Sequence, residues 1–187
     1  VDHVHLFHPA YKVLKERAAG LGPIRAIRTI SGGPGPDRDD ATVLWDWGSH
    51  DVAMCLDLMG AMPENATARR LEQRTDGEAV SLRLDFPGGV RADVEISNIM
   101  EQKTRCFSAQ TDRGTLVYDG KGPSPLTLNL DGQAEVAVEV AATPALDCAV
   151  MAFAVAVREG SSDTASLRLG ADTVAVLARC QRHLDGS

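Results

Sequence analysis

The stretch Val80-Ser81-Leu82-Arg83-Leu84-Asp85-Phe86, followed after a turn by Val90-Arg91-Ala92-Asp93-Val94-Glu95-Ile96, decides the fold class of this chain. In both segments apolar and polar residues alternate, as in a strand with one buried and one exposed face. The intervening Pro87-Gly88-Gly89 predicts a turn that makes the two strands antiparallel. A sheet with one apolar and one polar face therefore forms the centre of the expected structure.

Further strands are expected on both sides of this pair. Asp76-Gly77 predicts a hairpin turn before it, and Asp112-Arg113-Gly114 predicts another turn after it. The additional strands expected from alternation and turn spacing cover residues 66–75, 104–111, 115–118, 126–130 and 135–140. We interpret the series as an antiparallel meander.

Helical patterns flank the meander. A strand over residues 1–7, a helix from Pro9 to Gly20 or Gly22 and a strand over residues 24–30 come first, and a loop is expected over residues 31–41. A helix then runs from Asp46 to Gly60. Two helices close the chain. Residues 145–158 are apolar almost all round and are expected to lie buried against the sheet, while residues 167–184 carry one apolar stripe of Val174, Leu177, Ala178 and Leu184. The prediction is a single α+β domain over residues 1–187, an open, mainly antiparallel sheet with helices on one face.

The composition of the chain excludes some classes of binding partner. The chain has 19 Lys and Arg against 26 Asp and Glu, a net charge of −7, so it has no basic excess for nucleic acid. No apolar run approaches the roughly 20 residues that a membrane-spanning helix needs, and no signal peptide is evident. We expect a cytoplasmic protein that does not bind membranes. The four cysteines show no C-x-x-C pair and are expected to be small buried side chains.

The densest polar cluster is Trp45-Asp46-Trp47-Gly48-Ser49-His50-Asp51, at the expected start of a helix. Asp46 and His50 are four residues apart and share a helix face, where a carboxylate can fix the tautomer of an imidazole used for proton transfer. Gly48 would let a ligand approach the backbone. The alternative is structural: Asp46 or Ser49 caps the helix, His50 is an ordinary histidine, and the two tryptophans pack.

The sequence contains two weaker motifs. His3 and His5 would share one strand face and could bind a metal with Asp46 or His50, although no third ligand is fixed by local spacing, and we predict no metal site. The segment Gly32-Gly33-Pro34-Gly35-Pro36 is glycine-rich, but its prolines lack the N–H groups that a phosphate loop needs. It is interpreted as a loop, with a solvated run of charges over residues 37–40 that could cover a pocket.

The combined pattern resembles the C-terminal domain of the Gfo/Idh/MocA oxidoreductases, the family of glucose-fructose oxidoreductase and inositol dehydrogenase. The most specific likeness is Asp46-x-Gly48-x-His50, which matches the family's D-x-G-x-H motif. The other similar stretches are residues 4–15 with Gly22-Pro23-Ile24-Arg25, then Gly114-Thr115-Leu116, and the tail from Pro144 to Leu184 with Phe153, Val157 and Gly160.

This resemblance implies that His50 is the acid/base for a substrate hydroxyl or carbonyl and that Asp46 assists it, while NAD or NADP exchanges hydride. We expect Trp45, Trp47 and His8 to contact the substrate. The substrate would be a sugar, an inositol or a sugar nucleotide. The resemblance also implies a homo-oligomer formed through the open sheet face, and residues 1–8 would end a preceding N-terminal Rossmann domain.

Two departures from the family limit what this chain does by itself. The family often has a second acid three residues after the motif histidine, where this chain has Ala53, with Asp51 next to His50 instead. No G-x-G-x-x-G follows a strand, so no cofactor is expected to bind this chain alone, which is predicted to be inactive without its partner domain. A non-catalytic binding or oligomerisation module is the alternative hypothesis, and a metal-dependent hydrolase is a distant third.

Overall fold

The computed structural model describes residues 3–35, 40–161 and 164–186, and the expected charged run 37–40 lies outside them except for Asp40. Its helices are η1 (Val4–Phe7), α1 (Pro9–Ala19), α2 (Val43–Asp46), α3 (Gly48–Met59), η2 (Pro87–Gly89), α4 (Ala145–Glu159) and α5 (Thr164–Leu184). Its strands are β1 (Ile24–Pro34), β2 (Asn65–Arg74), β3 (Gly77–Asp85), β4 (Arg91–Ser97), β5 (Ile99–Thr111), β6 (Gly114–Asp119), β7 (Leu126–Leu130) and β8 (Val136–Ala137).

The predicted fold class is confirmed, but the meander is interrupted. The described strands form an eight-stranded sheet in the order β2-β3-β4-β1-β5-β6-β7-β8. β1 lies between β4 and β5, parallel to β4 and antiparallel to β5. The expectation that β4 pairs with β5 was therefore wrong. Alternation shows which residues face the core, but it does not show which strands are neighbours.

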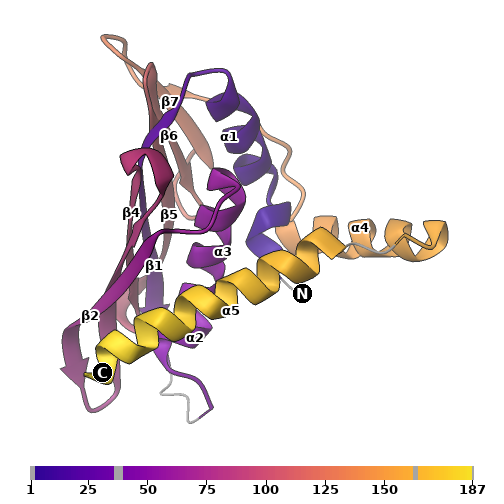
Figure 1. Ribbon diagram of the computed structural model, residues 1–187. Helices are drawn as coiled ribbons and strands as arrows, with labels where there is room; N and C mark the ends of the chain where they lie inside the picture. Colours follow the sequence, from indigo (N-terminus) through magenta and orange to yellow (C-terminus); the bar gives the residue numbers. More distant parts are fainter. Residues whose placement is uncertain (1–2, 36–39, 162–163, 187) are drawn as a thin grey trace.

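Helices α1, α3 and α5 cover one face of the sheet (Figure 1). The core between these layers contains fully buried side chains such as Tyr11 of α1, Leu82 of β3, Ile96 of β4 and Phe107 of β5. The opposite face is polar, because the same strands alternate. There Asp93 of β4 lies in register between the exposed Arg28 and Arg83 of the neighbouring strands.

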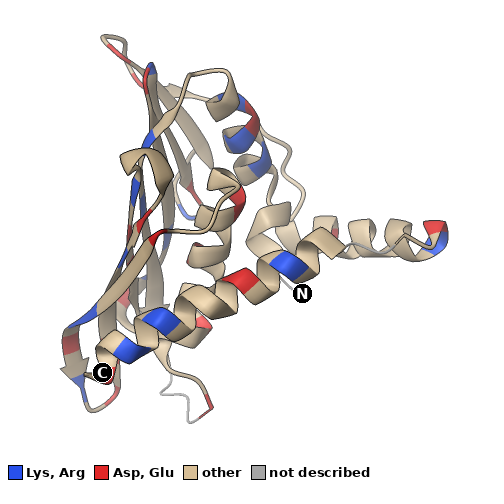
Figure 2. Ribbon diagram, in the orientation of Figure 1, with Lys and Arg blue, Asp and Glu red and all other residues tan. Residues whose placement is uncertain are grey.

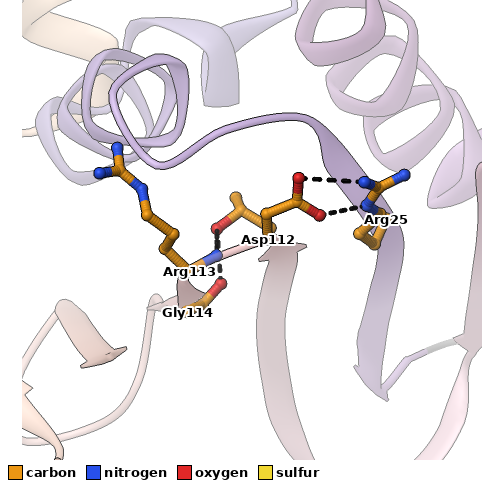
Figure 3. Close-up of polar contacts among 5 residues, drawn as sticks. Arg25, Asp112, Arg113 and Gly114 are labelled. Carbon is orange, nitrogen blue, oxygen red and sulfur yellow. Dashed lines mark hydrogen bonds and ion pairs between the residues drawn. The ribbon is translucent and has the colours of Figure 1, made fainter. Parts of the chain in front are cut away.

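A polar clamp fixes the connection between α1 and β1 (Figure 3). Arg25 forms a bidentate ion pair with Asp112 in the β5–β6 turn, and the guanidinium of Arg113 donates to the carbonyl of Gly20. The turn itself is closed by Thr111, whose hydroxyl donates to the Gly114 carbonyl at 2.8 Å. Arg25 and Asp112 are both exposed, so the pair defines the path of the chain more than it stabilises it.

Both ends of the chain differ from expectation. Residues 4–7 form a short 3-10 helix instead of a strand, and β1 continues to Pro34 into the expected loop. In α5 the buried side chains include Val176, Leu177 and Cys180, whereas Val174, predicted on the inward stripe, is 53% exposed.

Helix α4 departs most from expectation, because none of its residues is buried. It projects away from the sheet, and its charged residues lie chiefly at the far end (Figures 1 and 2). Phe153 is 71% exposed, and Leu146, Val150 and Val157 are also exposed. The prediction that α4 packs on the sheet was wrong, because the other helices already cover that face of the sheet. The apolar pattern of α4 indicates that its side chains contact another surface, but it does not show which surface.

Candidate functional site

The Asp46-to-Asp51 cluster does lie at a helix start, but the expected helix is broken in two. α2 ends at Asp46 and α3 begins at Gly48, with Trp47 between them. The N-cap position of α3 is held by Trp47, which gives no side-chain cap, and the Ser49 hydroxyl donates to the Asp46 carbonyl at 3.0 Å. Gly48 is buried, and a Cβ there would lie 3.1 Å from Cδ1 of Ile96, so this glycine permits close packing of α3 on the sheet rather than approach of a ligand.

An open cavity of about 370 Å³ lies beside this break. Four of the five predicted site residues line it: Asp46, Trp47, His50 and His8. The fifth, Trp45, does not; its indole N–H donates to Oε1 of Gln181 on α5 at 3.0 Å. The remaining lining residues are His5, Lys103, Arg105, Tyr118, Gly120, Lys121 and Ala145.

The histidines of the N-terminal segment contribute neutral rings to the cavity. Burial, followed by the charge of Arg105, lowers the pKa of His5 to about 3, and the His5 ring meets the His50 ring edge-on at 5.0 Å between centroids. Burial also lowers the pKa of His8. Its Nδ1 accepts from the Ala10 N–H at 3.1 Å, so His8 caps α1, and its ring lies 4.7 Å from that of Tyr118.

Because residues 4–7 form a 3-10 helix instead of the expected strand, His3 and His5 do not share one strand face. His3 is buried and borders a different cavity, of about 740 Å³, between η1, α3 and α5. Within the described ranges, no three His, Cys, Asp or Glu side chains are placed to hold a metal ion. The four cysteines are free thiols.

A buried polar network supports the floor of the 370 Å³ cavity. Asp51 is fully buried and accepts hydrogen bonds from the hydroxyls of Thr29 and Ser31 on β1. It also accepts from Nη1 of Arg105 at 3.0 Å. The Arg105 guanidinium lies 5.6 Å from the centre of the Trp47 ring, a cation–π distance. Arg105 is therefore held on one side by a carboxylate and on another by an indole.

Sequence reasoning missed the cationic residues of the cavity, Lys103, Arg105 and Lys121, together with Tyr118. One signal was available for Arg105. Along β5 the inward positions are 105, 107 and 109, so a charged side chain occupies a core position beside Phe107 and Ala109. Such a residue needs a buried partner, and Asp51 supplies it. Lys121 lies in a loop, where the sequence has no regular alternation from which the direction of a side chain could be predicted.

The structure is thus an α+β domain in which histidines of the N-terminal segment and the start of α3 line one cavity. Residues 14–117 match the family model described as the GFO/IDH/MocA C-terminal domain. The chain therefore belongs to the GFO/IDH/MocA family, as the resemblance predicted. Comparison with the curated proteins gave no match.

Solved structures show the same fold. A protein of Magnetospirillum magnetotacticum MS-1 named as an oxidoreductase is 38% identical, with a TM-score of 0.85; the match covers 96% of this chain and 62% of that one. UDP-N-acetylglucosamine 3-dehydrogenase GnnA from Acidithiobacillus ferrooxidans is 21% identical, with a TM-score of 0.85 and coverage of 98% and 60%. Biliverdin reductase from Synechocystis sp. PCC 6803, solved with biliverdin and NADP+, is 20% identical, with a TM-score of 0.78 and coverage of 99% and 62%.

The chain thus spans about 60% of the length of these structures. The latter two are similar in fold alone, and their named substrates differ widely. No helix within the described part of the chain is long and apolar enough to cross a membrane.

Proposed function

We propose that this chain is the substrate-side domain of an NAD(P)-dependent oxidoreductase that acts on the hydroxyl or carbonyl of a sugar, an inositol or a sugar nucleotide. The observation that carries the proposal is that Asp46 and His50 of the D-x-G-x-H motif line one cavity together with His8 and Trp47. This cavity has the size of a small-molecule site.

In this proposal His50 accepts the proton of the substrate hydroxyl, and returns it in the reverse direction, as a general base and acid. Asp46 assists from the same side of the helix break, and the neutral ring of His8 binds the substrate. NAD or NADP, when bound by the complete protein, accepts the hydride. The sequence of this chain has no G-x-G-x-x-G loop to hold a dinucleotide, so the cofactor would be bound by a preceding Rossmann domain that ends near residue 8.

Two surfaces support the proposed assembly. Helix α4 lies next to η1 at the N-terminal end of the described chain, where a preceding domain would connect (Figure 1). Its apolar side chains Leu146, Val150, Phe153 and Val157 are exposed. Exposed apolar patches of this kind mark contact surfaces. The polar sheet face would bind a second copy, which gives the homo-oligomer.

The test is His50→Ala in the full-length protein, with His183→Ala as a matched control, because His183 is an exposed histidine near the end of α5. We expect turnover to fall by about 100-fold or more in His50→Ala, the usual effect of removing a general acid/base. Cofactor affinity, measured by the fluorescence of bound NADH or NADPH, should stay unchanged in both variants. Unchanged turnover in His50→Ala would contradict the proposed role and favour a non-catalytic module.

A further inference from the structure

Positive charge is concentrated in the cavity of an otherwise acidic chain. Lys103 and Arg105 of β5 and Lys121 of the following loop all line it, while the whole chain carries a net charge of −7. The carboxylate in the lining is Asp46, whereas the fully buried Asp51 pairs with Arg105 from behind the cavity and Asp119 accepts from the N–H of Lys121. Because His5 and His8 have lowered pKa values, they add no charge at neutral pH. The residues that line the cavity therefore include three cationic side chains and one carboxylate.

Among the cationic residues of the cavity, Arg105 is the one best placed to bind an anion. It is 6% exposed, and its guanidinium is fixed between Asp51 and the Trp47 ring. An arginine has five N–H donors, and the structure shows a hydrogen bond to a described side chain from Nη1. Its side chain lines the cavity. A planar guanidinium that is held rigidly in this way is suited to bind a carboxylate.

We propose that the substrate carries a carboxylate, bound by Arg105 with Lys103 and Lys121, close to the hydroxyl or carbonyl that His50 serves. This inference rests on the proposed function and narrows its substrate class to a sugar acid or a related hydroxy acid. The planar, rigidly held guanidinium of Arg105 matches the two coplanar oxygens of a carboxylate.

The experiment measures binding to the full-length protein with its cofactor, by calorimetry. Three probes differ only at the sixth carbon: glucose is neutral, glucuronate has a carboxylate, and glucose 6-phosphate has a phosphate. We expect glucuronate to bind about 10-fold or more tightly than glucose, which is the effect of one charge-assisted hydrogen bond. Glucose 6-phosphate should bind more weakly than glucuronate.

Substitutions of the charged residues show which side chains produce the preference for glucuronate. Lys103→Met and Lys121→Met should each weaken glucuronate binding more than glucose binding, so that the ratio of the two affinities falls. Lys12→Met is the matched control, since Lys12 borders the other cavity. Arg105→Gln is made together with Asp51→Asn, so that no buried charge is left without a partner, and should abolish the preference for glucuronate. Melting curves confirm that each variant is folded.

Equal binding of glucose and glucuronate, or no binding of either, would overturn the carboxylate assignment, and so would tighter binding of glucose 6-phosphate. These outcomes are separable from the test of His50. If His50→Ala loses turnover but glucuronate shows no preference, the proposed function stands and this inference fails. If glucuronate is preferred but His50→Ala retains turnover, the cavity binds carboxylates and the role of His50 fails.

Discussion

Replacing Asp51 by Asn tests whether the buried network supports both the fold and the site. Asp51 is fully buried, and Arg105, its ionic partner at 3.0 Å, is almost as inaccessible. Removing one member of a buried ion pair costs about 3–5 kcal/mol, because the other charge is left uncompensated. Asn keeps an oxygen that can accept from Thr29 or Ser31, so we expect a loss of about 3 kcal/mol, at the lower end of that range.

The assay is urea denaturation followed by circular dichroism, on Asp51→Asn, Arg105→Met and the double variant. The double variant should be more stable than the sum of the single losses predicts, because it leaves no unpaired charge. Lys15→Met is the control, since it removes an exposed partner of Asp57 and should change stability by less than about 1 kcal/mol. A loss below about 1 kcal/mol in Asp51→Asn, or strict additivity in the cycle, would refute the reasoning.

Three further predictions concern other parts of the molecule. The pKa of His5 is about 3 in the folded state and 6.5 in the unfolded state, so between these values the unfolded state binds the extra proton and stability falls as the pH drops below 6.5. At pH 4.5 the loss should be roughly 3 kcal/mol and should be absent from His5→Asn, as measured by urea midpoints against pH. Gly32→Ala would place a Cβ against the carbonyl oxygen of Ser97 on the neighbouring strand β4. We expect a loss of about 1–3 kcal/mol in the same assay, and an unchanged midpoint would argue against the β1–β4 pairing. Phe153→Ser on exposed α4 should change the stability of this chain by less than about 0.5 kcal/mol, whereas a large destabilisation would mean that α4 packs on the rest of the domain.

The alternation of apolar and polar residues predicted where the strands lie more reliably than which strands are neighbours in the sheet. The alternation in β3 and β4 reflects one buried and one exposed face, which is a property of each strand by itself. The insertion of β1 between β4 and β5 depends on pairing energies between segments far apart in sequence. α4 shows the same limit, because its apolar residues indicate a contact without identifying the partner.

The sequence predicted the part of the candidate site whose residues lie close together along the chain. Asp46 and His50 belong to one short motif, so spacing was enough to place them on the same cavity. Arg105 and Tyr118 come from β5 and β6, and the register of the sheet brings them there. Trp45 was assigned by proximity to the motif, but the break at Trp47 directs it toward Gln181 of α5 instead.

The first turn of α3 connects the proposed proton transfer by His50 to the proposed carboxylate binding by Arg105. His50 and Asp51 are consecutive: His50 lines the cavity, whereas Asp51 is buried against β1 and holds Arg105. The inserted strand β1 supplies the two hydroxyls that fix Asp51. A movement of Asp51 must therefore displace both the His50 backbone and the Arg105 guanidinium. Asp51 is accordingly a positioning residue in the proposed enzyme, and its substitution should weaken carboxylate binding and slow turnover together, whereas Lys121→Met should affect binding alone.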